Sequence, residues 1–189
     1  MSFQIYLASR SPRRQELLRQ IGVSYELLPS DVAEVPRPGQ PAADYVVAIA
    51  LAKARDAAAR AQEKRPVLGA DTDVVLDGQI LGKPADRADA LNMLCRLSGR
   101  AHEVYSAVAL VDGARQRSAL SVTRVKFGPV SAAQAQAYWD SGEPCDKAGA
   151  YAIQGLGARF VQSVDGSYSG VMGLPLFETC GLLAQFGVL

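Results

Sequence analysis

The stretch VLGADTDVVLDGQIL, residues 67–81, decides the fold class of this 189-residue chain. It begins with an apolar run at residues 67–70, which is typical of a buried strand. The dipeptide Asp77-Gly78 then separates two short strand-like runs and favours a two-residue hairpin turn. The sequence therefore predicts a buried strand that ends at the acidic residues 71–73, followed directly by an antiparallel hairpin.

Helical and strand patterns alternate on both sides of this stretch. Pro12 after Ser11 marks the start of a helix that ends at Gly22. Further segments are read from apolar periodicity: helices at 41–64, 86–98, 131–141 and 175–186, and strands at 5–8, 25–28, 103–111, 118–126 and 159–164. Alternating elements with two antiparallel hairpins favour an α/β protein with a mixed sheet, and the length suits a single domain over residues 1–189.

The composition excludes several classes of protein. Lys and Arg number 20 against 19 for Asp and Glu, so a broadly basic surface for nucleic acid is not expected. No apolar run approaches the roughly 20 residues of a membrane helix, and the first ten residues lack a secretory leader pattern. We therefore expect a cytoplasmic protein with neither a nucleic-acid nor a membrane partner. Three dispersed cysteines and one histidine, His102, make a zinc site improbable.

An anion site is predicted where the first strand passes into the first helix, in the stretch LASRSPRR at residues 7–14. Ser9, Arg13 and Arg14 adjoin the free N–H groups of the helix start, and guanidinium groups match phosphate oxygens. The alternative is that both arginines are merely solvated. Because cations near a helix N-terminus oppose its dipole, a functional reason for their placement is favoured.

Three further positions suggest chemistry. The stretch Asp71-Thr72-Asp73, at the expected strand end, offers a carboxylate suited to bind a metal or position water, although an ordinary turn acid is equally expected there. Lys53 is surrounded by small apolar residues on its helix and needs an anionic partner if it is buried, whereas an exposed Lys53 would simply extend to solvent. Lys83 follows the predicted hairpin and could point back toward the same opening. His102, within a strand pattern, is more typical of a structural residue than of a general base.

Five motifs, in order along the whole chain, resemble those of the Maf family, also called septum formation inhibitor proteins. They are SRSPRR at 9–14, GADTD at 69–73, LGKP at 81–84, DKAGAYAIQG at 146–155, and DGSY at 165–168 continuing to GLP at 173–175. The resemblance implies a metal-dependent nucleoside triphosphate pyrophosphatase that cleaves between the α and β phosphates. It also implies an elongated mixed β-sheet with flanking helices, in two lobes around a central cleft, related to the inosine triphosphatases.

The resemblance also implies roles for particular residues. Asp71 matches the family's proton acceptor, and Glu34, Lys53 and Lys83 match other residues implicated in the reaction. Ser9, Arg13 and Arg14 would bind phosphate. A divalent cation, Mg²⁺ or Mn²⁺, would be held by Asp71 and Glu34, because hard oxygen ligands suit these ions.

Arg13, Thr72 and Gln154 resemble the residues found at these positions in the subgroup that acts on dTTP and UTP. A small-molecule nucleotide is therefore the expected partner. One alternative is a 7-methyl-GTP pyrophosphatase of the same family, and another is a non-catalytic, nucleotide-binding regulator of septum formation. A homodimer is a further expectation, with Tyr138 and Trp139 either at its interface or facing the core.

Overall fold

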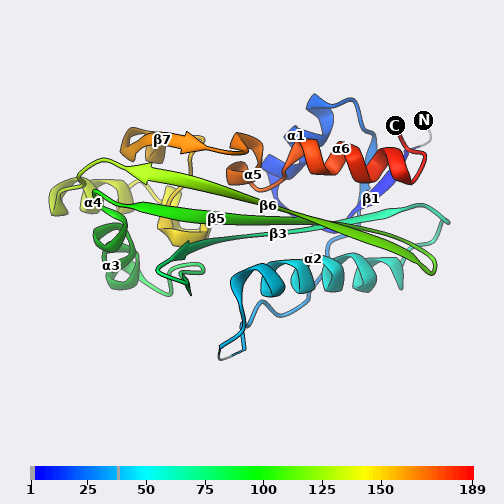
Figure 1. The fold of residues 1–189 in the computed structure, drawn as a ribbon, viewed down its shortest axis with the longest axis horizontal. Coiled ribbons are helices and arrows are strands. Elements are labelled where there is room, and N and C mark those ends of the chain that lie inside the picture. The colour runs from blue at the N-terminus through cyan, green and yellow to red at the C-terminus, as the bar shows by residue number, and fades with distance from the viewer. Residues whose placement is uncertain (1–2, 38) are drawn as a thin grey trace.

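The computed structural model describes residues 3–37 and 39–189, in which seven strands form one mixed sheet (Figure 1). The order is β2-β1-β3-β5-β6-β7, with β4 paired to β3 alone. β1 is parallel to β2 and β3, whereas every other pair is antiparallel, so the expected mixed sheet is confirmed. The strands are β1 (Ile5–Leu7), β2 (Tyr25–Leu27), β3 (Val67–Leu76), β4 (Gln79–Ile80), β5 (Ala101–Asp112), β6 (Arg115–Phe127) and β7 (Val161–Asp165).

Helices cover both faces of the sheet, and the molecule is elongated along the direction of its long strands β3, β5 and β6 (Figure 1). The α-helices are α1 (Pro12–Gln20), α2 (Ala42–Ala58), α3 (Arg87–Leu97), α4 (Ala132–Trp139), α5 (Tyr168–Met172) and α6 (Leu176–Gln185). Short 3₁₀ turns are η1 (Glu143–Asp146), η2 (Ala148–Ala150) and η3 (Leu156–Phe160). One end of the molecule carries α1, α2 and α6, and the other carries α3, α4 and β7 (Figure 1). None of the helices in the described part of the chain has the length and apolar character needed to cross a membrane.

The strand β3 differs from its expected form. The expectation that this strand ends at the acidic residues 71–73 is wrong, because β3 continues through them to Leu76. Its residues pair with β5 from Val67 opposite Val111 to Val75 opposite Glu103. This long antiparallel ladder satisfies the backbone throughout, so the acids lie in the middle of a buried strand. The hairpin turn at Asp77-Gly78 is confirmed, since β4 folds back onto β3.

Helix α2 also differs, because it ends at Ala58 although alanine-rich sequence continues for several residues. The expected end at Lys64 is therefore wrong. Tyr6 donates its backbone N–H to the carbonyl of Pro66 at 2.9 Å, at the start of the pairing between β1 and β3. The chain needs residues 59–66 to make this return, so strand pairing overrides helix propensity.

Gly69 sets how closely α2 lies against β3. A Cβ atom at Gly69 would lie 2.3 Å from the carbonyl oxygen of Ala50 and 2.7 Å from the backbone nitrogen of Ala54. Both of these atoms belong to the backbone of α2. The absence of a side chain at Gly69 therefore brings the helix into direct contact with the strand face that also carries Asp71.

His102 lies in an aromatic core at the other end of the sheet, as its structural interpretation predicts. It is 3% exposed, its ring packs edge-on against Phe127, and its Nε2 lies 2.8 Å from the hydroxyl of Tyr151. Burial lowers the pKa of His102 to about 4, so the ring is neutral near pH 7.

We expect Gly69→Ala to destabilise the protein by on the order of 2–3 kcal/mol, because the methyl group would force α2 off the strand. Urea unfolding measures the loss. The matched control is Gly181→Ala in α6, where an added Cβ meets nothing within 4 Å. Because alanine favours a helix, this control should gain up to about 1 kcal/mol. Equal stabilities of the two variants would contradict the close-packing argument.

The buried imidazole predicts a pH-dependent contribution to stability. An unfolded chain binds a proton at His102 near pH 6.5, whereas the folded chain does so only near pH 4. As the pH falls through this window, wild type should therefore lose stability relative to His102→Gln by about 1.4 kcal/mol per pH unit. Urea unfolding of both proteins at pH 7, 6 and 5 tests this. A stability difference that stays constant with pH would contradict it.

Candidate active site

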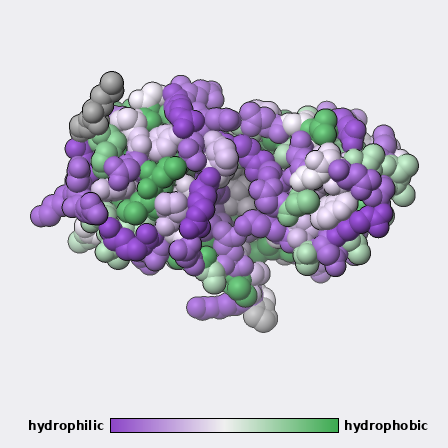
Figure 2. All heavy atoms as spheres, turned by 180° about the vertical axis from the view of Figure 1, so that it is seen from behind, coloured by the Kyte–Doolittle hydropathy of each residue, from purple (hydrophilic) through white to green (hydrophobic). Residues whose placement is uncertain are grey.

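A cleft of about 950 Å³ is lined by residues 71–74 of β3, by the start of α1 and by residues 146–148 and 151–154. Figure 2 shows a hollow near the middle of the face opposite to that of Figure 1, with mostly hydrophilic side chains around it. The nine residues singled out from the sequence all line this cleft: Ser9, Arg13, Arg14, Glu34, Lys53, Asp71, Thr72, Lys83 and Gln154. The expected central cleft is thus present, and it brings together segments that are far apart in the sequence.

A chain of ion pairs crosses the floor of the cleft. The Nζ of Lys53 donates to Asp71 Oδ1 at 2.7 Å and to Glu34 Oε1 at 2.5 Å, and the Nζ of Lys83 donates to Glu34 Oε2 at 2.9 Å. Lys53 and Asp71 are 7% and 5% exposed. This settles the choice left open for Lys53, which is buried and has anionic partners.

The carboxyl groups differ in their affinity for protons. Burial raises the pKa of Asp71, and the adjacent charge of Lys53 limits the increase. Burial also tends to raise the pKa of Glu34, but hydrogen bonds from Lys53 and Lys83 outweigh it and give a net pKa of about 2. Glu34 is therefore firmly ionised at neutral pH, whereas Asp71 is a stronger base than an ordinary aspartate.

Asp73 is a cleft residue that the sequence grouped with Asp71 but to which it gave no role of its own. It shares a face of β3 with Asp71, is 9% exposed, and has its pKa raised to about 7 by burial and then by the charges of Asp71 and Glu34. Tyr45 of α2, 4% exposed, lines the cleft too, and burial followed by the charge of Asp73 raises the pKa of its hydroxyl. The alternation of side chains along one continuous strand would have placed both acids together.

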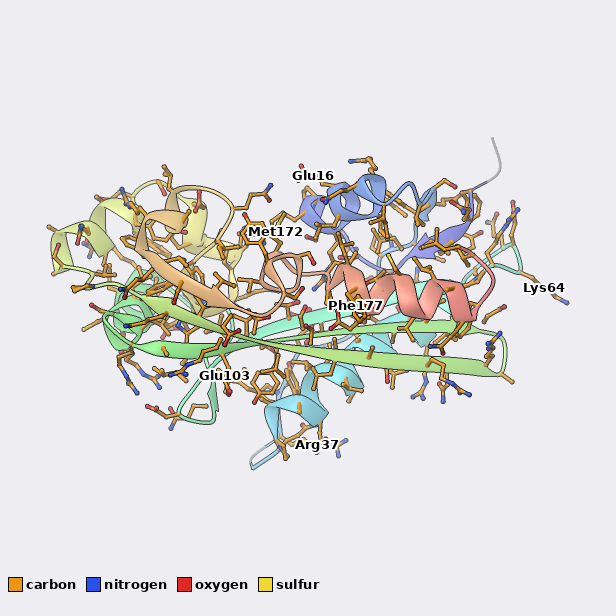
Figure 3. All side chains as sticks on the ribbon, turned by 45° about the horizontal axis from the view of Figure 1, so that its top comes forward. Glu16, Arg37, Lys64, Glu103, Met172 and Phe177 are labelled. Carbon is orange, nitrogen blue, oxygen red and sulfur yellow. The ribbon has the colours of Figure 1, made fainter. Side chains whose placement is uncertain are left out.

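The first turn of α1 is fixed by Ser9 and Arg14. Ser9 Oγ accepts from Arg14 Nη1 at 3.1 Å and from the backbone N–H of Ser11 at 3.2 Å. Arg14 Nε donates to the carbonyl of Gly173 at 2.8 Å, which ties α1 to the end of α5 beside the cleft-lining Met172 (Figure 3). Ser11 occupies the N-cap position of α1, and its side chain makes no capping hydrogen bond.

Thr72 and Gln154 lie on different parts of the chain, and Arg13 lines the cleft in the first turn of α1. The Thr72 hydroxyl is 2.7 Å from that of Ser106 on β5. Gln154 is exposed, lines the same cleft and follows the buried residues Ala152 and Ile153. The structure thus places Thr72 and Gln154 around one opening without a hydrogen bond between them.

The balance of charge favours an anionic ligand. Among the described residues, six cationic and four anionic side chains line the cleft. The cations are Arg10, Arg13, Arg14, Lys53, Lys83 and Lys147, and the anions are Glu34, Asp71, Asp73 and Asp146. Clefts with an excess of one charge concentrate ligands of the opposite charge.

The donor set also suits a hard metal ion bound together with a ligand. Within residues 3–37 and 39–189, no group of three or more His, Cys, Asp or Glu is placed to hold a metal ion. Mg²⁺ is, however, usually held by one or two carboxylates together with substrate phosphates and water. Asp71 and Asp73 supply two neighbouring, mostly buried carboxylates, so the residues fit such an ion.

This geometry defines an α/β protein with a cation-rich cleft built around a buried Lys–Asp pair. The chain belongs to the Maf-like protein family, whose sequence profile matches residues 4–186, and this confirms the resemblance read from the five motifs. Two relatives are each named dTTP/UTP pyrophosphatase. The one from Aromatoleum aromaticum is 52% identical over 97% of this chain and 96% of its own, and the one from Methylococcus capsulatus is 54% identical over 98% and 92%.

Among solved structures, a nucleoside-triphosphatase / dITP/XTP pyrophosphatase from Mycobacterium abscessus aligns with 97% of this chain and 94% of its own. Its TM-score is 0.44 and its sequence identity is 18%, so the likeness is remote.

Removing the ammonium of Lys53 should show how much the stability of the protein depends on this buried charge. We expect Lys53→Met to lower the free energy of unfolding by about 3 kcal/mol, because Asp71 would stay buried without its partner. The double variant Lys53→Met/Asp71→Asn should recover part of this loss. The control is Lys64→Met, at an exposed lysine that extends away from the body of the molecule (Figure 3). Equal losses in Lys53→Met and Lys64→Met would contradict this interpretation.

Proposed function

We propose that the protein hydrolyses dTTP and UTP between the α and β phosphates, releasing the nucleoside monophosphate and pyrophosphate. The observation that carries this proposal is Asp71, a buried carboxylate hydrogen-bonded to Lys53 inside a cation-rich cleft. A carboxylate with a raised pKa, surrounded by phosphate-binding cations, is suited to activate water beside a polyphosphate. The names of relatives about half identical to this chain support the same reaction.

The triphosphate would bind between the two ends of the molecule. Arg13 and the N–H groups at the start of α1 would contact its oxygens from one side, and Lys83 from the other. Arg14, held by Ser9 and Gly173, would fix the position of that first turn. Lys53 and Lys83, paired with Glu34, would stabilise the negative charge that builds up on the leaving pyrophosphate.

In the chemical step, a water oxygen attacks the α phosphorus while one of its protons passes to the carboxylate of Asp71. The bond from the α phosphorus to the bridging oxygen breaks, and its electron pair leaves with pyrophosphate. Burial raises the pKa of Asp71, which strengthens it as a base, and the charge of Lys53 favours its ionised form. Glu34 would position both lysines.

We propose that a divalent cation, Mg²⁺ or Mn²⁺, binds with the substrate at Asp71 and Asp73. When bound, such an ion neutralises phosphate charge. Asp73 suits this role better than the predicted ligand Glu34, because both oxygens of Glu34 accept hydrogen bonds from lysines. A cation would also offset the repulsion from Asp71 and Glu34 that, after burial, raises the pKa of Asp73.

The base would be read at the end of the cleft that contains Gln154, with Arg13 and Thr72 contributing to the choice. A glutamine amide offers one acceptor and two donors, which suits the alternating carbonyl and N–H groups of thymine and uracil. A 7-methyl-GTP pyrophosphatase remains the alternative within the family. The expected homodimer, cytoplasmic location and possible regulatory role stay predictions.

The test is pyrophosphate release from dTTP, UTP, CTP, GTP and 7-methyl-GTP, with Mg²⁺, with Mn²⁺ and with chelator. We expect metal-dependent turnover that is fastest with dTTP and UTP. Turnover led by 7-methyl-GTP would favour the alternative pyrophosphatase, and nucleotide binding without turnover would favour a regulator.

Asp71→Asn should lower turnover by about 1000-fold, because an amide cannot accept the proton from water. The fold should persist, since Glu34 still pairs with Lys53. Pyrophosphate release and the melting temperature are measured side by side. The matched control is Asp77→Asn, at an exposed hairpin residue with a left-handed φ of 52° that asparagine also adopts. Retained turnover in Asp71→Asn would exclude Asp71 as the base.

A further inference from the structure

Glu143, at the start of η1, makes three hydrogen bonds that bear on the cleft. Its Oε1 accepts from the Tyr138 hydroxyl at 2.7 Å and from the backbone N–H of Gly157 at 3.0 Å. Its Oε2 accepts from the N–H of Leu156 at 2.9 Å. The side chain does not line the cleft, so Glu143 can influence a bound nucleotide only through the residues that it holds.

Tyr138 completes this arrangement from inside the core. Its ring is fully buried, so the core-facing alternative for this residue is the one observed, and its hydroxyl accepts from the N–H of Ala152 at 3.0 Å. Glu143 and Tyr138 therefore hold both ends of the segment 152–157. Gln154 lies between these two anchoring points and is exposed to the cleft.

Two glycines allow the segment 152–157 to pack closely against the carboxylate of Glu143. A Cβ at Gly155, whose φ is 137°, would lie 2.4 Å from Glu143 Oε2. A Cβ at Gly157 would lie 2.5 Å from the carbonyl oxygen of Ala152 and 2.6 Å from the Tyr138 hydroxyl. The loop is thus closed tightly on itself around the Glu143–Tyr138 pair, which leaves its tip little freedom.

We propose that Glu143 is a positioning residue for nucleotide choice: by clamping the segment 152–157, it orients Gln154 toward the base. This inference rests on the proposed function, in which Gln154 reads the base. Charge-assisted hydrogen bonds to backbone N–H groups suit this task, because they fix a loop without occupying the cleft. Glu143 is also the first residue of η1, which ends at the cleft residue Asp146 and is followed by the cleft residue Lys147. Glu143 therefore connects the segment 152–157 to the segment that carries these two residues.

The test is Glu143→Gln, which keeps the size of the side chain but places an NH₂ group against backbone donors. The ratio of kcat/KM for dTTP to that for CTP should fall about tenfold, while kcat for dTTP stays within about threefold of wild type and its KM rises. Tyr138→Phe, which keeps the buried ring, should change the ratio in the same direction. Glu103→Gln, at an exposed strand residue outside the cleft (Figure 3), is the control and should leave the ratio unchanged.

A double-mutant cycle with Gln154→Ala distinguishes positioning from a general structural role. In the Gln154→Ala background, Glu143→Gln should cause no further loss of discrimination, because the residue through which it acts is gone. Additive losses in the cycle, an unchanged ratio in Glu143→Gln, or an equal loss of kcat/KM for every nucleotide would overturn the proposal.

Hydrogen exchange separates failure of this inference from failure of the proposed function. If wild type turns over none of the nucleotides, the proposed function fails, and the clamp is judged by the amides of Leu156 and Gly157. They should be protected in wild type and in Glu103→Gln, and should exchange at least about tenfold faster in Glu143→Gln. Unchanged exchange in Glu143→Gln would overturn the clamp.

Discussion

The buried ion pair between Lys53 and Asp71 is the interaction on which the rest of this site depends. A carboxylate in the middle of a sheet strand is costly unless a cation reaches it. That cation comes from α2, which can lie close enough only because Gly69 presents no side chain to it. Once Lys53 is fixed there, Glu34 and then Lys83 join it through hydrogen bonds, so one close helix–strand contact organises the floor of the cleft.

The two ends of the molecule serve this cleft differently. Around α1, a serine and two arginines line the cleft, and Arg14 is held by hydrogen bonds within the protein. Around η1 and η3, Glu143 and Tyr138 hold a closed loop with Gln154 at its tip. The long strand β3 carries the acids, so the phosphate contacts, the general base and the nucleobase contacts that we propose would share one opening about 950 Å³ in volume.

Local signals predicted the parts of the fold that depend on local physics. Pro12 begins α1, Asp77-Gly78 turns the first hairpin, and α3 begins at the N-cap Asp86, each through chemistry confined to a few neighbouring residues. Where the end of an element depends on partners distant in sequence, the expected boundaries were wrong. β3 continues through the acids because β5 pairs along its length, and α2 stops at Ala58 because the chain must return to pair with β1.

The sequence by itself determined the mixed α/β class, the family, and nine of the residues that line the cleft, because residue type and order along the chain carry that information. Only the tertiary structure decided that Lys53 pairs with Asp71, that Asp73 shares the buried face, and that Glu143 holds the loop of Gln154. Hydrogen bonds and pKa shifts depend on distance and burial in space. Lys53 and Asp71 are 18 residues apart in sequence and their charged atoms 2.7 Å apart in the folded chain, so this contact exists only once α2 packs on β3.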